Sequence, residues 1–291
     1  LLRLVRRLRR VAERAGLDAA PEGRSPMQVR RADLGSEGPT YWLLQYNTQD
    51  FGWFYAEHVT QVPCGLKIWA PAAVMCRYFA AGLGRALVAG RRCLEVGCGV
   101  GALALAAEGA GAERVLATDA CGLCLRVGRL NAKLNGASRV EFARLQYGAE
   151  EAVRLRESWG RFDVMLGADV VYSNKVVVPL LGTAAELLGP GGRFLLGFVE
   201  RGEELRGVLE EAAEAAGFAF EREALGEAMR RAEMEASRPA LLTGALAELQ
   251  QQLRLLPGPG AHLRESEAGV KLYTFFRRAE VPDPGYLDAM D

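Results

Sequence analysis

The string LEVGCGVGA at residues 94–102 decides the fold of this chain. There, an apolar run ends in a glycine-rich turn that opens a helical pattern. Glycine is needed where the backbone takes conformations that a Cβ forbids, or where a ligand approaches the main chain closely. The spacing fits G-x-G-x-x-G/A through Gly97, Gly99 and Ala102, and it fits acid-x-G-x-G-x-G through Glu95, Gly97, Gly99 and Gly101. Both patterns predict a nucleotide-type ligand, and neither alone identifies it.

A second apolar run, at residues 115–118, ends in a carboxylate, Asp119, which follows Gly97 by 22 residues. An acid at this place can accept both hydroxyl groups of a cofactor ribose. This holds for nicotinamide-dependent and for S-adenosylmethionine-dependent enzymes alike. The alternative is an acid on a surface loop.

From residue 91 the chain alternates short apolar runs with longer helical patterns, as in a parallel sheet covered by helices. We expect an α/β fold with a doubly wound, mostly parallel, Rossmann-like sheet of seven strands, an N-terminal extension and a helical insertion before the last strand. The expected strands are 92–96, 114–118, 139–144, 162–168, 192–198, 217–222 and 270–276. The expected helices are 100–109, 121–136, 176–188 and 202–216, and the insertion covers 225–256.

The run GADVVY at residues 167–172 follows directly from the expected strand 162–168. In a doubly wound sheet this fourth strand lies next to the first, across the switch point where ligands bind. We therefore expect Asp169 and Tyr172 to face the reactive end of a ligand that rests on residues 97–101. The alternative is a helix-capping Asp and a core Tyr.

Together these residues resemble the seven-β-strand methyltransferases that use S-adenosylmethionine, and more narrowly the family-16 group of non-histone protein-lysine methyltransferases. The resemblance covers about residues 60–278. It rests on Ile68-Trp69 with Ala72, LEVGCGVG at 94–101, Asp119, Asn131, Tyr147-Gly148 and GADVVY at 167–172. The chain departs from the family pattern at two places. Trp69 is followed by Ala70-Pro71, where many members have an acid, and Tyr147, after Gln146, stands where many members have Trp. We expect the first departure to touch the substrate side.

The resemblance implies S-adenosyl-L-methionine as the cofactor, no metal, and a protein partner that presents a lysine. The implied cofactor pocket consists of Trp69, Glu95, Gly97, Cys98, Gly99, Gly101, Asp119, Tyr147 and Ala168. Asp169 and Tyr172 match the family's D-x-x-Y and are implied to be catalytic. In these roles Asp169 orients the incoming ammonium group, and the ring of Tyr172 holds it by a cation–π contact.

The activity implied by the resemblance is methyl transfer to the ε-amine of a lysine. Arginine, histidine, a protein terminus and a small molecule are alternative acceptors. A nicotinamide-dependent dehydrogenase is a further alternative, but Glu95 and the GADVVY run have no role in one. A non-catalytic binding module is the last, and the intact glycine turn, Asp119 and D-x-x-Y argue against it. The sequence identifies neither a general base nor the number of methyl groups added.

The expected catalytic domain at residues 91–278 is flanked by segments of different composition. Residues 1–40 combine a basic amphipathic pattern at 1–16 with a Pro-, Gly- and Ser-rich linker. We expect the first helix to pack on the domain; a membrane-surface helix, a partner-binding helix and a transit peptide are alternatives. Residues 41–90 hold an aromatic-rich stretch at 41–55, predicted as a hairpin or a substrate-binding lip, and a lead-in helix. Residues 279–291 form an acidic tail.

Composition excludes several classes of function. The 36 basic residues balance 36 acidic ones, so no net basic charge favours nucleic acid, and we expect no nucleic-acid partner. The sequence contains no run of 18 apolar residues, so it predicts no membrane span. The oligomeric state is not predictable from these patterns.

Six cysteines without a signal-peptide pattern indicate a reducing compartment, and we expect the cytoplasm. Import into an organelle through the Arg-rich N-terminus is the alternative. Cys121 and Cys124 form a CxxC, which we interpret as small buried hydrophobes, with redox or metal chemistry as the alternative.

Overall fold

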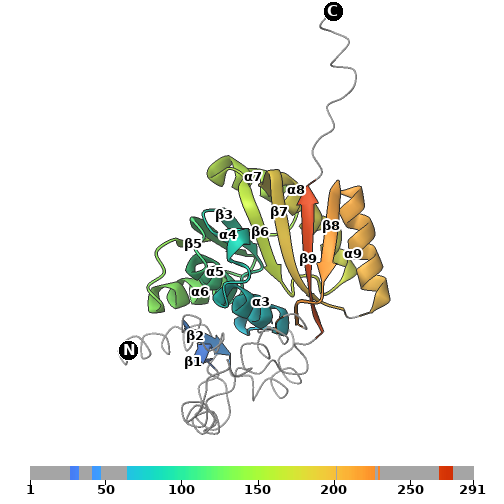
Figure 1. Cartoon of the computed structure of the whole chain (residues 1–291). Helices are drawn as coiled ribbons and strands as arrows, with labels where there is room; N and C mark the ends of the chain where they lie inside the picture. Colours follow the sequence, from blue (N-terminus) through green and yellow to red (C-terminus); the bar gives the residue numbers. More distant parts are fainter. Residues whose placement is uncertain are drawn as a thin grey trace, which may run out of the picture.

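A seven-stranded sheet forms the centre of the protein (Figure 1). The computed structural model describes residues 27–32, 41–46, 64–200, 202–226, 229 and 269–277. The sheet order is β5-β4-β3-β6-β7-β9-β8; the first five of these strands are parallel, and β9 runs antiparallel to both its neighbours. The strands are β3 (Arg92–Val96), β4 (Arg114–Asp119), β5 (Val140–Arg144), β6 (Phe162–Ala168), β7 (Leu188–Val199), β8 (Phe218–Glu223) and β9 (Val270–Arg277).

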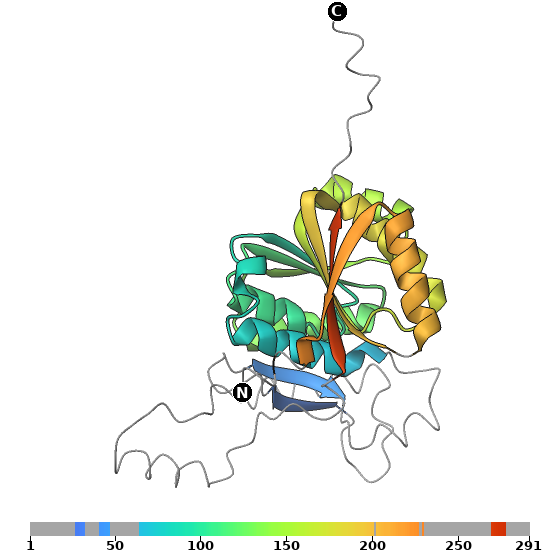
Figure 2. The same cartoon turned by 45° about the vertical axis from the view of Figure 1, so that its right-hand side comes forward.

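Helices cover both faces of the sheet, as Figures 1 and 2 show. One layer contains α3 (Ala70–Ala80), the short α4 (Arg85–Val88), α5 (Ala102–Gly109) and α6 (Gly122–Leu134). The other contains α7 (Ala149–Trp159), α8 (Asn174–Leu187) and α9 (Glu203–Ala215). Each layer has its own buried cluster of side chains against the sheet. No helix in the described ranges is long and apolar enough to cross a membrane.

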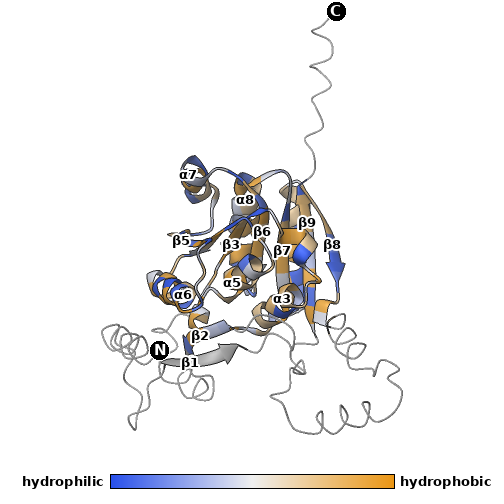
Figure 3. Cartoon of the chain, turned by 60° about the vertical axis from the view of Figure 1, so that its left-hand side comes forward, coloured by the Kyte–Doolittle hydropathy of each residue, from blue (hydrophilic) through white to orange (hydrophobic). Residues whose placement is uncertain are grey.

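Burial on two faces explains the sequence of the strands. Strands β3, β4 and β6 lie inside the sheet, so both of their faces are covered and their residues form nearly continuous apolar runs. Figure 3 shows β3 and β6 mostly in hydrophobic colours. The edge strand β8 instead ends in Glu221-Arg222-Glu223, all exposed, and charges on an edge discourage pairing with another chain.

The doubly wound, mostly parallel sheet of seven strands is confirmed. Strand β7 begins at Leu188, four residues earlier than predicted. Helix α7 was not predicted, because only Ala152 and Leu155 of its eleven residues are buried, which leaves a weak helical period. The predicted helix at 1–16 and the tail at 279–291 lie outside the described residues, as does most of the insertion at 225–256.

An N-terminal hairpin precedes the sheet. Strand β1 (Met27–Ala32) pairs antiparallel with β2 (Tyr41–Tyr46). The first of these lies in the stretch predicted as a linker, so that prediction is wrong at residues 27–32. The aromatic-rich stretch does form a strand at its start, where Tyr41 is buried and its hydroxyl donates to the Leu105 carbonyl at 2.9 Å. Residues 51–55, with their four aromatics, lie outside the described part.

Asn131 of α6 and Asn135, the C-cap residue of that helix, take the place of a neighbouring strand along the edge of β2. The side chain of Asn131 accepts the Leu44 N–H at 2.7 Å and donates to the Leu44 carbonyl at 3.1 Å. One helical turn later, Asn135 makes the same pair of bonds with Trp42, both at 2.8 Å. Asn131 also donates to the Val100 carbonyl at 2.9 Å, so one buried amide joins the hairpin, α6 and the glycine-rich turn.

This arrangement predicts that Asn131→Ala destabilises the protein by about 2 to 3 kcal/mol, because it leaves buried backbone groups of Leu44 and Val100 without partners. Asn135→Ala is the matched control, and since Asn135 is more exposed we expect a loss of about 1 kcal/mol or less. Urea unfolding measures both free energies, and hydrogen exchange at the Leu44 amide reports the hairpin. Equal, small losses in the two variants would contradict the anchoring role of Asn131.

Candidate active site

The glycine turn after β3 is built from left-handed backbone. Gly97, Gly99 and Gly101 have φ angles of +63°, +53° and +79°, a region that side chains of L-residues rarely adopt. The N–H of Cys98 donates to the Thr118 carbonyl at 2.9 Å, which ties the turn to the end of β4. The thiol of Cys98 itself is buried. The predicted binding residues 97–101 therefore form one turn directly before α5, buried except at Gly97, which is half-buried.

Glu95 lies beneath this turn. Its side chain is 3% exposed, and its carboxylate accepts the N–H of Ala104, the third residue of α5, at 2.9 Å. This bond satisfies an N–H group that the helix itself leaves unpaired. Burial raises the pKa of Glu95 well above its ordinary value. The structure thus gives Glu95 a role in fixing the start of α5, and a direct contact with the cofactor stays a prediction.

Asp119 ends β4 beside the same turn. One carboxylate oxygen accepts the Gly99 N–H at 2.9 Å, and the other accepts the Cys121 N–H at 2.8 Å. Burial raises the pKa of Asp119, although backbone N–H groups favour its charged form. Each oxygen keeps a second lone pair. The two bonds therefore hold the carboxylate in a fixed orientation in which it can still accept two hydroxyl groups.

A short turn ahead of α3, η2 (Cys64–Leu66), packs on the glycine turn. A Cβ built on Gly99 would lie 2.4 Å from the Gly65 carbonyl oxygen, and one built on Gly65 would lie 3.7 Å from the Asp119 carboxylate. The indole N–H of Trp69 donates to the Cys64 carbonyl at 3.0 Å and closes this turn. Sequence reasoning missed Gly65, whose signal was a single glycine in a Pro-Cys-Gly turn.

Trp69 is the N-cap residue of α3, and Pro71 occupies the first turn of that helix, where proline is well tolerated. Pro71 is buried and packs near Gly197 of β7. Ala70 and Pro71, where the chain departs from the family pattern, therefore begin a helix that packs on the sheet. These contacts do not test the expectation that the departure touches the substrate side.

Two side chains bring the ends of β5 and β6 onto the glycine turn. A Cβ built on Gly97 would lie 2.8 Å from the hydroxyl oxygen of Tyr147 and 2.7 Å from a methyl carbon of Val170. Burial raises the pKa of Tyr147, and the nearby charges of Asp119 and Tyr172 raise it further. Residues that follow β3, β5 and β6 thus meet at one place, as expected for a doubly wound sheet.

The D-x-x-Y segment starts with a backbone in an uncommon conformation. Ala168 ends β6, and Asp169 follows with a φ of +59°, the one non-glycine residue with positive φ in the described ranges. Its N–H donates to the Gly197 carbonyl of β7 at 2.9 Å, so the neighbouring strand holds this conformation. Such strain is concentrated at functional sites in proteins.

Tyr172 lies three residues further on and is 64% exposed. The alternative interpretation of this segment is wrong on both points. The N-cap of α8 is Ser173 and not Asp169, and Tyr172 is a surface side chain and not part of the core. Asp169 and Tyr172 therefore lie at the carboxyl end of β6, next to the strand that carries the glycine turn.

The cysteines near the turn are thiols. All six are free; of the CxxC pair, Cys124 is buried on α6, as the hydrophobic interpretation predicts, whereas Cys121 is only half-buried. Burial raises the pKa of Cys124, which disfavours the reactive thiolate. Within the described residues, no group of three or more His, Cys, Asp or Glu side chains could hold a metal ion.

Comparison with known proteins identifies relatives of this arrangement. Residues 54–214 match the model of a family described as lysine methyltransferase. EEF1A lysine methyltransferase 3 of Mus musculus is 25% identical over 196 residues, which cover 66% of this chain and 79% of that protein. Protein-lysine N-methyltransferase EFM3 of Chaetomium thermophilum is 32% identical over 149 residues, covering 48% and 44%.

Ribosomal protein L11 methyltransferase of Pseudomonas aeruginosa is 36% identical over 124 residues, covering 41% of this chain and 38% of that protein. The chain thus spans less than half the length of this relative and of EFM3. Two solved structures share the fold. RsmC, a T. thermophilus 16S rRNA methyltransferase in complex with AdoMet and guanosine, has a TM-score of 0.51, 18% identity, and covers 89% of this chain and 53% of its own. The methyltransferase SMU.776 with SAH has a TM-score of 0.52, 11% identity, and covers 88% and 56%.

The close approach of Gly65 to Gly99 predicts that Gly99→Ala weakens binding of S-adenosylmethionine about tenfold or more, the equivalent of about 1.4 kcal/mol. The added Cβ displaces η2, because its neighbour is a backbone carbonyl that cannot rotate away. Gly136→Ala is the matched control, since Gly136 has a φ of +69° and nothing within 4 Å of its Cβ position. Titration calorimetry should find the affinity of that variant unchanged, with a stability loss of about 1 kcal/mol. Equal affinities for the two variants would contradict the packing role of Gly65.

Burial of Glu95 predicts a dependence of stability on pH. The pKa of Glu95 is higher in the folded than in the unfolded chain, so its contribution is most favourable below the unfolded pKa and is lost as pH rises toward the folded pKa. Glu95→Gln keeps an oxygen for the Ala104 N–H and cannot ionise. We expect this variant to gain stability over the wild type as pH rises above the ordinary pKa of a glutamate, because only the wild type then has to keep a proton on, or bury the charge of, this side chain.

Urea unfolding at several pH values measures the difference. Glu113→Gln, at an exposed glutamate before β4, is the control and should follow the wild type at every pH. A Glu95→Gln variant that is less stable than the wild type at pH 8 would show that the folded state needs the negative charge.

Proposed function

Because this chain belongs to the lysine methyltransferase family, we propose that it transfers a methyl group to the ε-amine of a lysine on a protein. It is an S-adenosylmethionine-dependent methyltransferase, and the family model covers every assigned site residue from Trp69 to Tyr172. The observation that carries the proposal is the position of Asp169 and Tyr172 at the end of β6, directly across from the glycine turn. The names of two relatives give protein acceptors, EEF1A and ribosomal protein L11, which supports a protein over a small molecule.

The chain's residues fit the cofactor. The left-handed glycine turn brings η2 and Tyr147 close to its main chain, and the oriented carboxylate of Asp119 suits the two hydroxyl groups of a ribose. Tyr147, next to that carboxylate, supplies an aromatic ring for adenine. Bound S-adenosylmethionine supplies an electrophilic methyl group, so the protein mainly has to align the acceptor with it.

Asp169 and Tyr172 act on the acceptor. A lysine reaches the site as an ammonium ion and must lose its proton before it can act as a nucleophile. The carboxylate of Asp169 accepts a hydrogen bond from the nitrogen and fixes its direction. The exposed ring of Tyr172 holds the cationic form before deprotonation by a cation–π contact. Bulk water, which reaches the exposed side of Tyr172, accepts the proton that the lysine ammonium group loses.

This assignment predicts that Asp169→Asn binds S-adenosylmethionine within about twofold of the wild type and loses turnover by a factor of about 100 or more, the size found when one hydrogen-bonding group is removed from an active site. Asparagine keeps the shape of the side chain and tolerates the left-handed backbone, so the variant folds. Calorimetry with the cofactor and a radiolabel assay measure the two effects. Full turnover in this variant would remove Asp169 from the mechanism.

The acceptor class is tested by incubating the protein with radiolabelled S-adenosylmethionine and a cell extract, followed by mass spectrometry of the labelled peptides. We expect the label on lysine side chains, and none with Asp169→Asn. Label on another residue type, on RNA or on a small molecule would overturn the proposed function, while leaving the cofactor assignment intact.

A further inference from the structure

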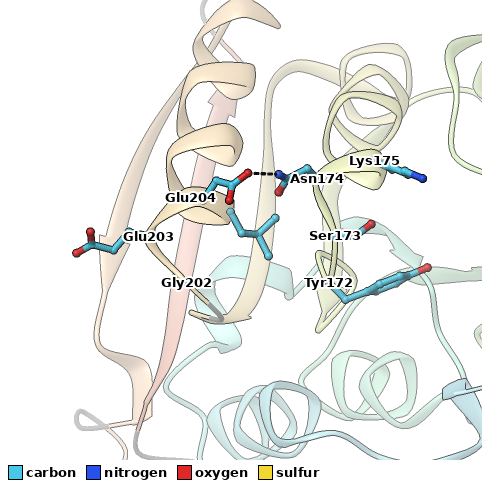
Figure 4. Close-up of a pocket in the computed structure, with 8 residues that line it drawn as sticks. Tyr172, Ser173, Asn174, Lys175, Gly202, Glu203 and Glu204 are labelled. Atoms are coloured by element: carbon cyan, nitrogen blue, oxygen red, sulfur yellow. Dashed lines mark hydrogen bonds between the residues drawn. The ribbon is translucent and has the colours of Figure 1, made fainter.

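An open groove lies between the starts of α8 and α9 (Figure 4). One wall is formed by residues 172–175 and the other by residues 202–205, and the volume is about 700 Å³. This volume is within the range of small ligand sites and exceeds what one side chain fills. The methyl-transfer mechanism above uses only Tyr172 at the edge of the groove.

The groove continues the acceptor side of the site. Its first wall begins at Tyr172, three residues after Asp169, and its second wall follows directly after β7. Both walls therefore lie at the carboxyl ends of neighbouring parallel strands, the edge at which doubly wound sheets bind their ligands. A protein whose lysine reaches Asp169 has to pass over or through this groove.

Two carboxylates, Glu203 and Glu204, and one cation, Lys175, line the groove, so its charge is negative on balance. Figure 4 shows the Lys175 side chain pointing away from Glu204, which leaves that carboxylate as the group that attracts a cation. The Asn174 amide donates to the Glu204 carboxylate at 3.0 Å across the groove, and Figure 4 shows this bond with Glu203 pointing away from Tyr172. Asn174 is neutral, so Glu204 keeps its full charge and a second oxygen for a cation. Glu200, on the same loop, differs because Arg206 and Lys271 both pair with it at 2.6 Å.

The surface beside the groove is apolar as well. Tyr172 is 64% exposed and Val178, on the second turn of α8, is 66% exposed. They are two of the four large hydrophobic side chains that stand exposed in the described part of the chain. Exposed apolar side chains next to charged ones are typical of surfaces that contact another protein.

We propose that this groove binds the acceptor protein next to the lysine to be methylated, and that Glu204 selects acceptors with a second basic side chain beside that lysine. The proposal rests on the proposed function and names its substrate class. The occupant is a segment of the acceptor protein: its second Lys or Arg pairs with Glu204, and its apolar part covers Tyr172. Glu203 and Glu204 outnumber Lys175 in this groove and would repel the phosphates of a nucleic acid, which disfavours that occupant.

The test compares Glu204→Gln with Glu211→Gln, a control at an exposed glutamate further along α9 and outside the groove. Each variant is incubated with labelled S-adenosylmethionine and a cell extract, and mass spectrometry gives the initial rate of methylation at each lysine. We expect labelled lysines to have a neighbouring Lys or Arg. Glu204→Gln should slow their labelling about fivefold, the size of an exposed ion pair, and Glu211→Gln should match the wild type.

Two further readouts separate recognition from a loss of folding. Cofactor affinity should be unchanged in both variants, and the slower rate of Glu204→Gln should recover in concentrated extract, since KM rises and kcat does not. Added salt should slow the wild type more than Glu204→Gln, because salt screens the ion pair. Wild-type rates for Glu204→Gln on lysines would overturn this inference alone, whereas a wild type that labels no lysine would overturn the proposed function and this inference with it.

Discussion

The left-handed backbone of the turn at residues 97–101 is the constraint on which the rest of the site depends. Without Cβ atoms on Gly97 and Gly99, a carbonyl from η2, the hydroxyl of Tyr147 and a methyl group of Val170 can all reach the turn. These groups come from segments that lie far apart in the sequence. The turn is therefore a packing centre for these segments, in addition to the cofactor-binding role proposed for it.

Two carboxylates beside this turn differ in role because they differ in surroundings. Glu95 is buried, and its bond to Ala104 holds the first turn of α5. Asp119 lies at the carboxyl end of β4, where two backbone N–H groups orient its carboxylate and leave lone pairs for a ligand. The motif places an acid before the first glycine and another at the end of β4. Only the structure separates the acid that supports the site from the acid that faces it.

The sequence predicts the sheet well because strands that are buried on both faces are continuous apolar runs with turn residues between them. It predicts poorly where an element is stabilised by a few distant contacts. Strand β1 has little apolar pattern of its own, and it forms as the partner of β2, which Asn131 and Asn135 hold on α6. The role of Asn131 joins residues 87 positions apart, and no local pattern reports such a bond. The left-handed conformation of Asp169 likewise depends on the carbonyl of Gly197, on the next strand.

The two proposed sides of the active site differ in which groups form them, and they therefore differ in how readily they tolerate substitution. The proposed cofactor side consists of main chain, glycine and carboxylates fixed by backbone N–H groups, so substitutions there disturb several packed segments at once. The proposed acceptor side includes exposed side chains at the starts of two helices, such as Tyr172 and Glu204. Surface positions of this kind change stability little. The fold therefore permits Glu204 to be replaced while the sheet and the glycine turn stay the same.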